Sequence, residues 1–129
     1  MAQPADRLYT KDHEWVKVDG PSAQIGITEY AQSSLGDIVY VELPKVNTLL
    51  EQGKPIGVVE SVKAVSDIYA PISGMVAEIN VSVEDDPAKV NRDPFGDGWL
   101  VKITISNADE TKNLLTADAY EALVQAESH

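Results

Sequence analysis

The chain has 129 residues, a length that fits one domain able to bury its own hydrophobic core. It contains no cysteine, which excludes a disulfide framework and a thiolate zinc site, and only two histidines, which argues against a histidine-rich metal site. The formal net charge of −11 argues against binding to nucleic acid or to an anionic membrane surface, because both attract clustered lysine and arginine side chains.

Short segments with alternating apolar residues predict strands through most of the chain. The first covers residues 15–18 and ends at the Asp19-Gly20 turn, and the alternation resumes over 23–27. Further strands are expected at 39–43, 56–60, 65–70, 75–81 and 100–105. Strands of this length and spacing favour a small sandwich or flattened barrel and do not suggest βαβ units, so a doubly wound nucleotide-binding sheet is disfavoured.

Helices are expected to be short and peripheral. Thr28 can cap a helix over residues 29–35, which Gly36 would end. After the last strand, Ser106 is expected to cap a second helical segment, because Asp109 follows it three residues later.

A third helix is expected near the C-terminus, where Tyr120, Leu123 and Val124 have the spacing of one helical face. We therefore expect a single domain over residues 1–129. Its core would cover about 23–105, and a helical segment would follow over 107–126.

The N-terminal stretch MAQPADRLYT has neither the apolar segment of a secretory signal nor the Arg-rich amphipathic character of a transit peptide. No apolar run approaches the roughly 20 residues that a membrane-spanning helix needs. We expect a cytoplasmic protein, or a protein of the mitochondrial matrix if this chain is the processed form of an imported one.

No catalytic motif is visible. The sequence lacks G-x-G-x-x-G, the P-loop pattern, H-E-x-x-H and G-x-S-x-G. Carboxylates are plentiful, but their abundance in an acidic chain does not indicate an acid–base pair, and no spacing supports a triad built on His13. We therefore expect no self-contained active site.

Lys63 is the residue that needs an explanation, since it lies in a short turn between two predicted strands. The ordinary interpretation is a solvated surface lysine. A Schiff-base lysine would need an apolar, desolvated pocket, which the nearby Ser61 and Ser66 do not indicate. A third interpretation is covalent attachment of a cofactor, because the tip of a hairpin holds an amine out where a modifying enzyme can reach it.

Four segments together resemble the glycine cleavage system H protein family in order and spacing, over nearly the whole chain. They are YTKDHEWV (9–16), GITEYAQSSLGDIVYVELP (26–44), ESVKAVSDIYAPISG (60–74) and VNRDPFGDGWLVKI (90–103). The resemblance implies a mostly β fold, a barrel-sandwich hybrid of the lipoyl/biotinyl hammerhead type with short peripheral helices. It also implies that Lys63 carries one lipoic acid group through an amide bond.

Members of this family are carriers and not catalysts. The resemblance implies that the lipoyl group on Lys63 accepts an aminomethyl group from glycine decarboxylase, which is a pyridoxal-phosphate enzyme. It would pass this group to a tetrahydrofolate-dependent aminomethyltransferase and be reoxidised by dihydrolipoyl dehydrogenase, after a lipoate-attaching enzyme has modified the lysine. The resemblance further implies that Glu14 and Asp67 line a cleft that shelters the loaded arm, whereas the ordinary interpretation makes them two surface acids.

The chain departs from the family at Met75, where an acid is common, and at Phe95, where tyrosine is frequent. These changes bear on partner preference and not on the attachment turn. A biotin carrier would usually have methionines beside the lysine, where this chain has Val62 and Ala64. A lipoyl domain of an α-ketoacid dehydrogenase typically has Asp before the lysine and adjoining catalytic domains, and an unmodified interaction module is a further alternative.

Overall fold

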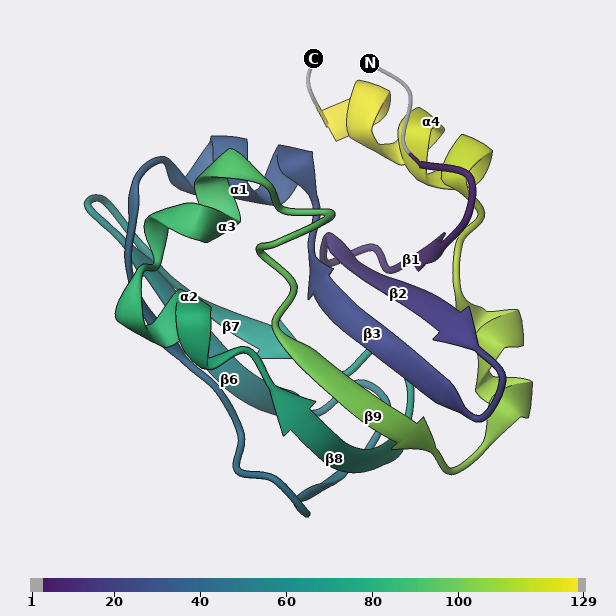
Figure 1. Cartoon of the computed structure of the whole chain (residues 1–129). Helices are drawn as coiled ribbons and strands as arrows, with labels where there is room; N and C mark the ends of the chain where they lie inside the picture. The colour runs from purple at the N-terminus through teal and green to yellow at the C-terminus, as the bar shows by residue number, and fades with distance from the viewer. Residues whose placement is uncertain (1–3, 128–129) are drawn as a thin grey trace.

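A computed structural model describes residues 4–127 of the chain, whose strands form two antiparallel sheets (Figure 1). The larger sheet has the strand order β1-β2-β3-β9-β8-β5, with bounds Leu8–Tyr9, Glu14–Asp19, Ser22–Ile27, Val101–Ile105, Gly74–Ile79 and Leu49–Leu50 in that order. The smaller sheet has the order β4-β6-β7, with bounds Ile38–Glu42, Pro55–Ser61 and Val65–Tyr69. The predicted mostly β fold with short helices is confirmed.

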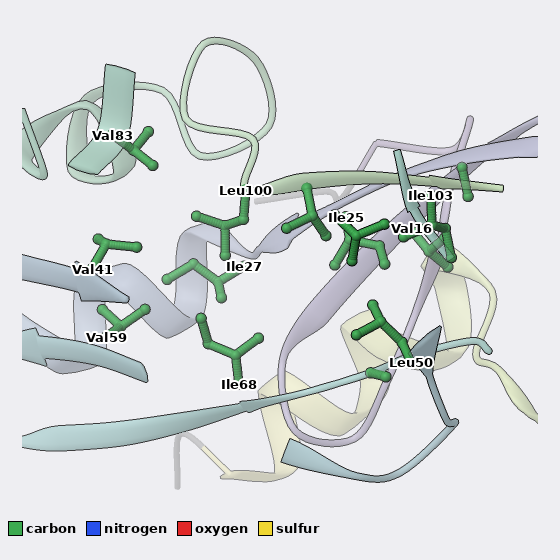
Figure 2. Close-up of a cluster of buried hydrophobic side chains, with 14 of the residues drawn as sticks. Val16, Ile25, Ile27, Val41, Leu50, Val59, Ile68, Val83, Leu100 and Ile103 are labelled. Carbon is green, nitrogen blue, oxygen red and sulfur yellow. The ribbon is translucent and has the colours of Figure 1, made fainter. Parts of the chain in front are cut away.

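Alternation along the strands places one face of each sheet in a shared core. In the larger sheet Val16 lies opposite Ile25, which in turn lies opposite Val101, and all three side chains are buried. Val59 and Ile68 point into the same core from the smaller sheet, as Figure 2 shows. Burying a side chain of this size contributes about 1.5–3 kcal/mol, so this row of contacts holds the two sheets together.

One glycine in β3 is required by close packing. Gly26 lies directly opposite Trp15 on β2, and a β-carbon added to Gly26 would lie 2.6 Å from the Trp15 ring. The indole of Trp15 therefore occupies the space above Gly26, and its Nε1 donates to the Pro94 carbonyl at 3.0 Å. Any larger residue at position 26 would displace this buried ring.

Helix α1 (Glu29–Leu35) forms where the sequence predicts it. The Thr28 hydroxyl accepts a hydrogen bond from the Ala31 N–H at 3.2 Å, which confirms the predicted N-cap. The helix ends at Gly36, whose φ of 81° lies in the left-handed region that favours glycine.

The capping residue predicted at Ser106 is wrong by one position. The N–H of Ser106 donates to the Ser73 carbonyl, so this residue follows β9 (Val101–Ile105) directly and does not begin the helical segment. The neighbouring Asn107 instead accepts from the Asp109 N–H at 3.1 Å and begins the 3₁₀ helix η1 (Ala108–Asn113).

Two short helices occupy a stretch in which the sequence indicates a longer strand. The strand predicted over 75–81 ends at Ile79, and α2 (Val81–Asp85) and α3 (Ala88–Arg92) follow. Asn80 turns the chain, because its buried Nδ2 donates to the carbonyls of Asp97 and Trp99. In Figure 1, α1, α2 and α3 gather at the end of the molecule from which the β6–β7 hairpin projects.

The C-terminal helix α4 (Ala117–Glu127) packs on the N-terminal side of the larger sheet. Tyr120 is fully buried and stacks on Tyr9 with ring centroids 4.7 Å apart. Phe95 belongs to the same aromatic cluster and contacts Tyr9 edge-on, whereas Met75 is partly exposed beside Leu49. Of the two residues that depart from the family pattern, Phe95 therefore lies at a packing position and Met75 at a surface position.

No helix in the described part of the chain is both long enough and apolar enough to cross a membrane.

Candidate functional site

Lys63 lies at the tip of the β6–β7 hairpin, which projects from the smaller sheet (Figure 1). The strands pair up to the edges of this turn, which spans residues 61–64. Ser61 closes the turn, since its N–H donates to the Ala64 carbonyl at 2.8 Å. The Ser61 hydroxyl also accepts from the N–H groups of Lys63 at 3.2 Å and Ala64 at 3.0 Å. An exposed lysine therefore sits on a turn that is fixed by its own hydrogen bonds.

The turn also contacts the segment that follows α1. The Val62 N–H donates to the Asp37 carbonyl at 3.0 Å. Next to it, a β-carbon added to Gly36 would lie 3.7 Å from Lys63 Cε, so the lysine side chain passes over this glycine. The tip is thus attached to the body of the protein at a second point, beyond the strand pairing.

The environment of Lys63 fits an amine that is modified rather than one that acts as a catalyst. Within residues 4–127, the ion pairs formed by lysine and arginine side chains do not include Lys63. Its side chain is exposed, so it lacks the apolar pocket that a Schiff-base lysine needs. Within this described part of the chain no acid pairs with the amine, and a group joined to it by an amide bond would extend into solvent.

The outer face of the smaller sheet carries carboxylates next to the Lys63 turn. Two rows of directly opposed residues cross from β4 through β6 to β7, and residues in such rows point to the same side of a sheet. The rows are Tyr40–Glu60–Val65 and Glu42–Val58–Asp67. They contain three acids and no lysine or arginine, and the residues on the two outer strands are exposed. We refer to these six residues as the acidic face.

Glu14, at the start of β2, is a buried acid whose carboxyl oxygens accept two hydrogen bonds. Only 2% of its surface is exposed. Its Oε1 accepts from the Thr10 hydroxyl at 2.6 Å, and its Oε2 accepts from the Tyr69 N–H at 3.2 Å. Burial raises the pKa of Glu14 to about 7, although both hydrogen bonds favour the charged form. This carboxyl group can therefore change its protonation near neutral pH.

A pocket of about 340 Å³ lies beside Glu14. Its lining comes from the segment before β2, the turn before β6, the end of β7 and the stretch that follows η1. Glu14 and the exposed Asp12 are the two acids in this lining, and Asp67 is not part of it. The structure places Asp67 on the acidic face, two residues before the Tyr69 N–H that binds Glu14.

A second hollow of about 700 Å³ lies over β2, β3, β8 and β9 on the larger sheet. It is away from the Lys63 turn, and none of the site residues expected from the sequence lines it.

His13 connects the start of β2 to the C-terminal helix. Its Nδ1 lies 2.8 Å from the Tyr120 hydroxyl, which lies 2.6 Å from the Thr28 hydroxyl. Its Nε2 pairs with Glu127 at 2.9 Å. Each nitrogen of the ring thus has a structural partner. In the described residues, no group of three or more His, Cys, Asp or Glu side chains could hold a metal ion.

Two features of the site were missed by sequence reasoning. Gln52 and Asn113 hydrogen-bond at 3.1 Å across the wall of the Glu14 pocket, and these residues are far apart in the chain. Asn91 on α3 binds the segment that supports the Lys63 turn. Isolated amides of this kind have no periodic or motif signal, so only the three-dimensional structure reveals their partners.

Comparison with known proteins agrees with these features. The family model for the glycine cleavage H-protein matches residues 7–127. The glycine cleavage system H protein of Herpetosiphon aurantiacus is 54% identical over 126 residues, which cover 98% of this chain and 96% of that protein. The H protein of Coxiella burnetii is 50% identical over 126 residues, with 97% of each chain covered. The crystal structure of a glycine cleavage system H protein from Mycobacterium marinum has a TM-score of 0.83 at 40% identity, covering 93% of this chain and 97% of that one.

Proposed function

This chain belongs to the glycine cleavage H-protein family, and we infer from that membership that it is the lipoyl carrier of glycine cleavage. It is a non-catalytic component of that system. The described site agrees with a carrier, because an exposed lysine on a fixed turn presents an attached group without supplying acid–base chemistry.

We propose Lys63 as the attachment point of the lipoyl group. The observation that carries this proposal is the Lys63 turn itself, which is closed by Ser61 and bound to Asp37 through Val62. Once attached, the dithiolane of the lipoyl group would supply the sulfur chemistry that a cysteine-free chain lacks. The protein would present the lipoyl group, since its turn fixes the position at which the arm begins.

We also propose that the enzymes expected from the family take turns at the same surface. These are glycine decarboxylase, the aminomethyltransferase, dihydrolipoyl dehydrogenase and the lipoate-attaching enzyme. An arm of about 10–15 Å can enter an active site only if the partner contacts the protein close to Lys63. The acidic face adjoins this lysine, so basic residues at the partners' entrances would complement it.

Glu14 and Asp67 are proposed to shelter the loaded arm between partners. At about 3.3 Å per residue, Asp67 lies about 13 Å along the chain from Lys63, and Tyr69 lies about 20 Å away. Asp67 is therefore within reach of a folded-back arm of about 10–15 Å. The path of about 20 Å to Tyr69 counts a straight chain, and the turn over residues 61–64 shortens it, so a fully extended arm would reach only the near edge of the Glu14 pocket. The cargo carries an amine, and carboxylates on this path would bind it in its cationic form.

The division of the chain into a core and a C-terminal helical segment within one domain stays a proposal. It is supported by the packing of Tyr120 on Tyr9, which ties α4 to the rest of the fold. The cytoplasmic location expected from the sequence also stays a prediction.

Reconstitution with the partner enzymes tests the function. Apo-protein that has been treated with lipoate and an attaching enzyme should support glycine-dependent release of CO₂. Lys63→Arg is the matched variant, because it keeps a positive charge at an exposed turn and cannot form the amide. It should keep its melting temperature, since surface changes usually stay within about 0.5 kcal/mol, and it should show no activity. Full activity of Lys63→Arg would overturn the proposal.

A further inference from the structure

Asn91 is a hydrogen-bonding centre between α3, α1 and β4. Its Nδ2 donates to the Gly36 carbonyl and to Gln32 Oε1, both at 2.9 Å. Its Oδ1 accepts from the Ile38 N–H at 2.9 Å. The side chain therefore binds the residues on both sides of Asp37 and fixes the short segment that links α1 to β4.

This segment is the one that supports the Lys63 turn. The Asp37 carbonyl, held between the two backbone groups that Asn91 binds, accepts from the Val62 N–H at 3.0 Å. Gly36, whose carbonyl Asn91 binds, lies under the Lys63 side chain. In Figure 1 the tip of the β6–β7 hairpin projects beside the connection from α1 to β4. A continuous path of contacts thus runs from Asn91 to the backbone next to the lysine.

We propose that Asn91 is a positioning residue for Lys63, and this rests on the proposed attachment of the lipoyl group. Asn91 holds the 36–38 segment, and this segment fixes the angle at which the hairpin tip leaves the protein. The attaching enzyme must bring the lysine Nζ to its activated acyl group, so a tip with a fixed direction spends more time in the reactive geometry. When Asn91 is removed, the hairpin itself stays paired, and its tip loses only its second attachment.

The ordinary interpretation is that Asn91 only stabilises the fold. Asn80 offers a matched control, because its Nδ2 also donates to two backbone carbonyls, those of Asp97 and Trp99. These carbonyls belong to the loop before β9, not to the segment that contacts Val62. Asn80→Ala should therefore lower the melting temperature by an amount comparable to that of Asn91→Ala, without changing the lysine turn.

The first measurement is amide hydrogen exchange in the unmodified full-length protein. In Asn91→Ala the Val62 N–H should exchange about fivefold faster than in wild type, relative to core amides of the same sample. Asn91→Asp should show the same change, because its carboxylate can still accept from Ile38 and cannot donate to Gly36. Asn80→Ala should leave the relative exchange rate of Val62 unchanged. Asn91→Asp provides the same test of Val62 exchange if Asn91→Ala does not fold.

The second measurement is the rate of lipoate attachment by a lipoate-attaching enzyme, followed by intact mass. We expect kcat/KM to fall about threefold or more in both Asn91 variants and to stay at the wild-type value in Asn80→Ala. The inference is overturned if Val62 exchange does not change in the Asn91 variants, if Asn80→Ala changes it equally, or if attachment is as fast as in wild type. Absence of attachment in wild-type protein would instead refute the proposed function, while the exchange data still test the positioning of the turn.

Discussion

Glu14 and Tyr69 are joined by a hydrogen bond that connects the two sheets. The Tyr69 N–H on β7 donates to Glu14 Oε2 on β2 at 3.2 Å. Because Glu14 is buried and also lines the pocket of about 340 Å³, its charge state affects both the packing of the sheets and the binding properties of the pocket.

Glu14 makes stability depend on pH in a definite direction. Burial raises its pKa from the ordinary 4.5 to about 7, so between these values the folded protein holds a proton that the unfolded chain has lost. The stabilisation that the protonated Glu14 gives to the folded state is therefore fully present below about pH 4.5 and is lost as the pH rises through about 7. Relative to Glu14→Gln, the free energy of unfolding of wild type should fall by about 1–3 kcal/mol between about pH 5 and about pH 8. Urea denaturation at both pH values measures this, and a constant difference would contradict a raised pKa.

Release of the cargo tests the proposed shelter. If Glu14 and Asp67 bind the amine of the loaded arm, Glu14→Ala and Asp67→Asn should each lose ammonia and formaldehyde severalfold faster than wild type. Attachment of lipoate should be normal in Asp67→Asn, because Asp67 is exposed. Asp118→Asn on α4 is the control, since it removes an exposed charge away from the path of the arm. Release at the wild-type rate from both variants would mean that the arm is simply exposed.

The Tyr120 hydroxyl should stabilise the docking of α4. It lies within hydrogen-bonding distance of His13 Nδ1 and the Thr28 hydroxyl in a buried position. Tyr120→Phe keeps the ring stacked on Tyr9 and leaves these groups with one partner fewer, so the free energy of unfolding should fall by about 1–3 kcal/mol. Tyr40→Phe, on the exposed acidic face, should change it by less than about 0.5 kcal/mol. Equal effects in the two variants, measured by thermal unfolding, would contradict the buried hydrogen bonds.

The acidic face should speed the encounter with partners. Association measured by stopped flow should slow as salt rises, because screening weakens the attraction of exposed charges. Glu42→Gln combined with Glu60→Gln should lower the association rate at low salt and reduce its dependence on salt. The double variant Asp118→Asn, Glu84→Gln has the same net charge as the Glu42→Gln, Glu60→Gln variant, but its changes lie outside the acidic face, so it should behave more like wild type. Rates that do not change with salt would remove the steering role.

The strands and α1 could be predicted because they depend on local patterns. Thr28 and Gly36 are capping residues whose chemistry acts within one turn, and the alternation around Ile25 and Ile103 reports directly on burial. Long-range contacts explain the errors. The predicted strand over 75–81 ends early because Asn80 binds carbonyls almost twenty residues away, and no local pattern contains that information.

The position of Lys63 in a hairpin turn could also be predicted, whereas the surroundings of Glu14 could not. The turn is set by residues 61–64, all close in sequence. The burial of Glu14 arises because β7 brings Tyr69 against β2. In a sequence with 21 aspartate and glutamate residues, nothing distinguishes this buried acid from an acid on the surface. The support of the turn by Asn91 was missed for the same reason.

Lys63 is expected to carry one lipoyl group. The most direct test is the intact mass of the protein purified from its native host, followed by peptide mapping. We expect the sequence mass plus one lipoyl group, located on the peptide that contains Lys63, and no such addition in Lys63→Arg. Native protein that supports glycine cleavage with an unmodified Lys63, or with biotin on that residue, would contradict lipoyl attachment at Lys63.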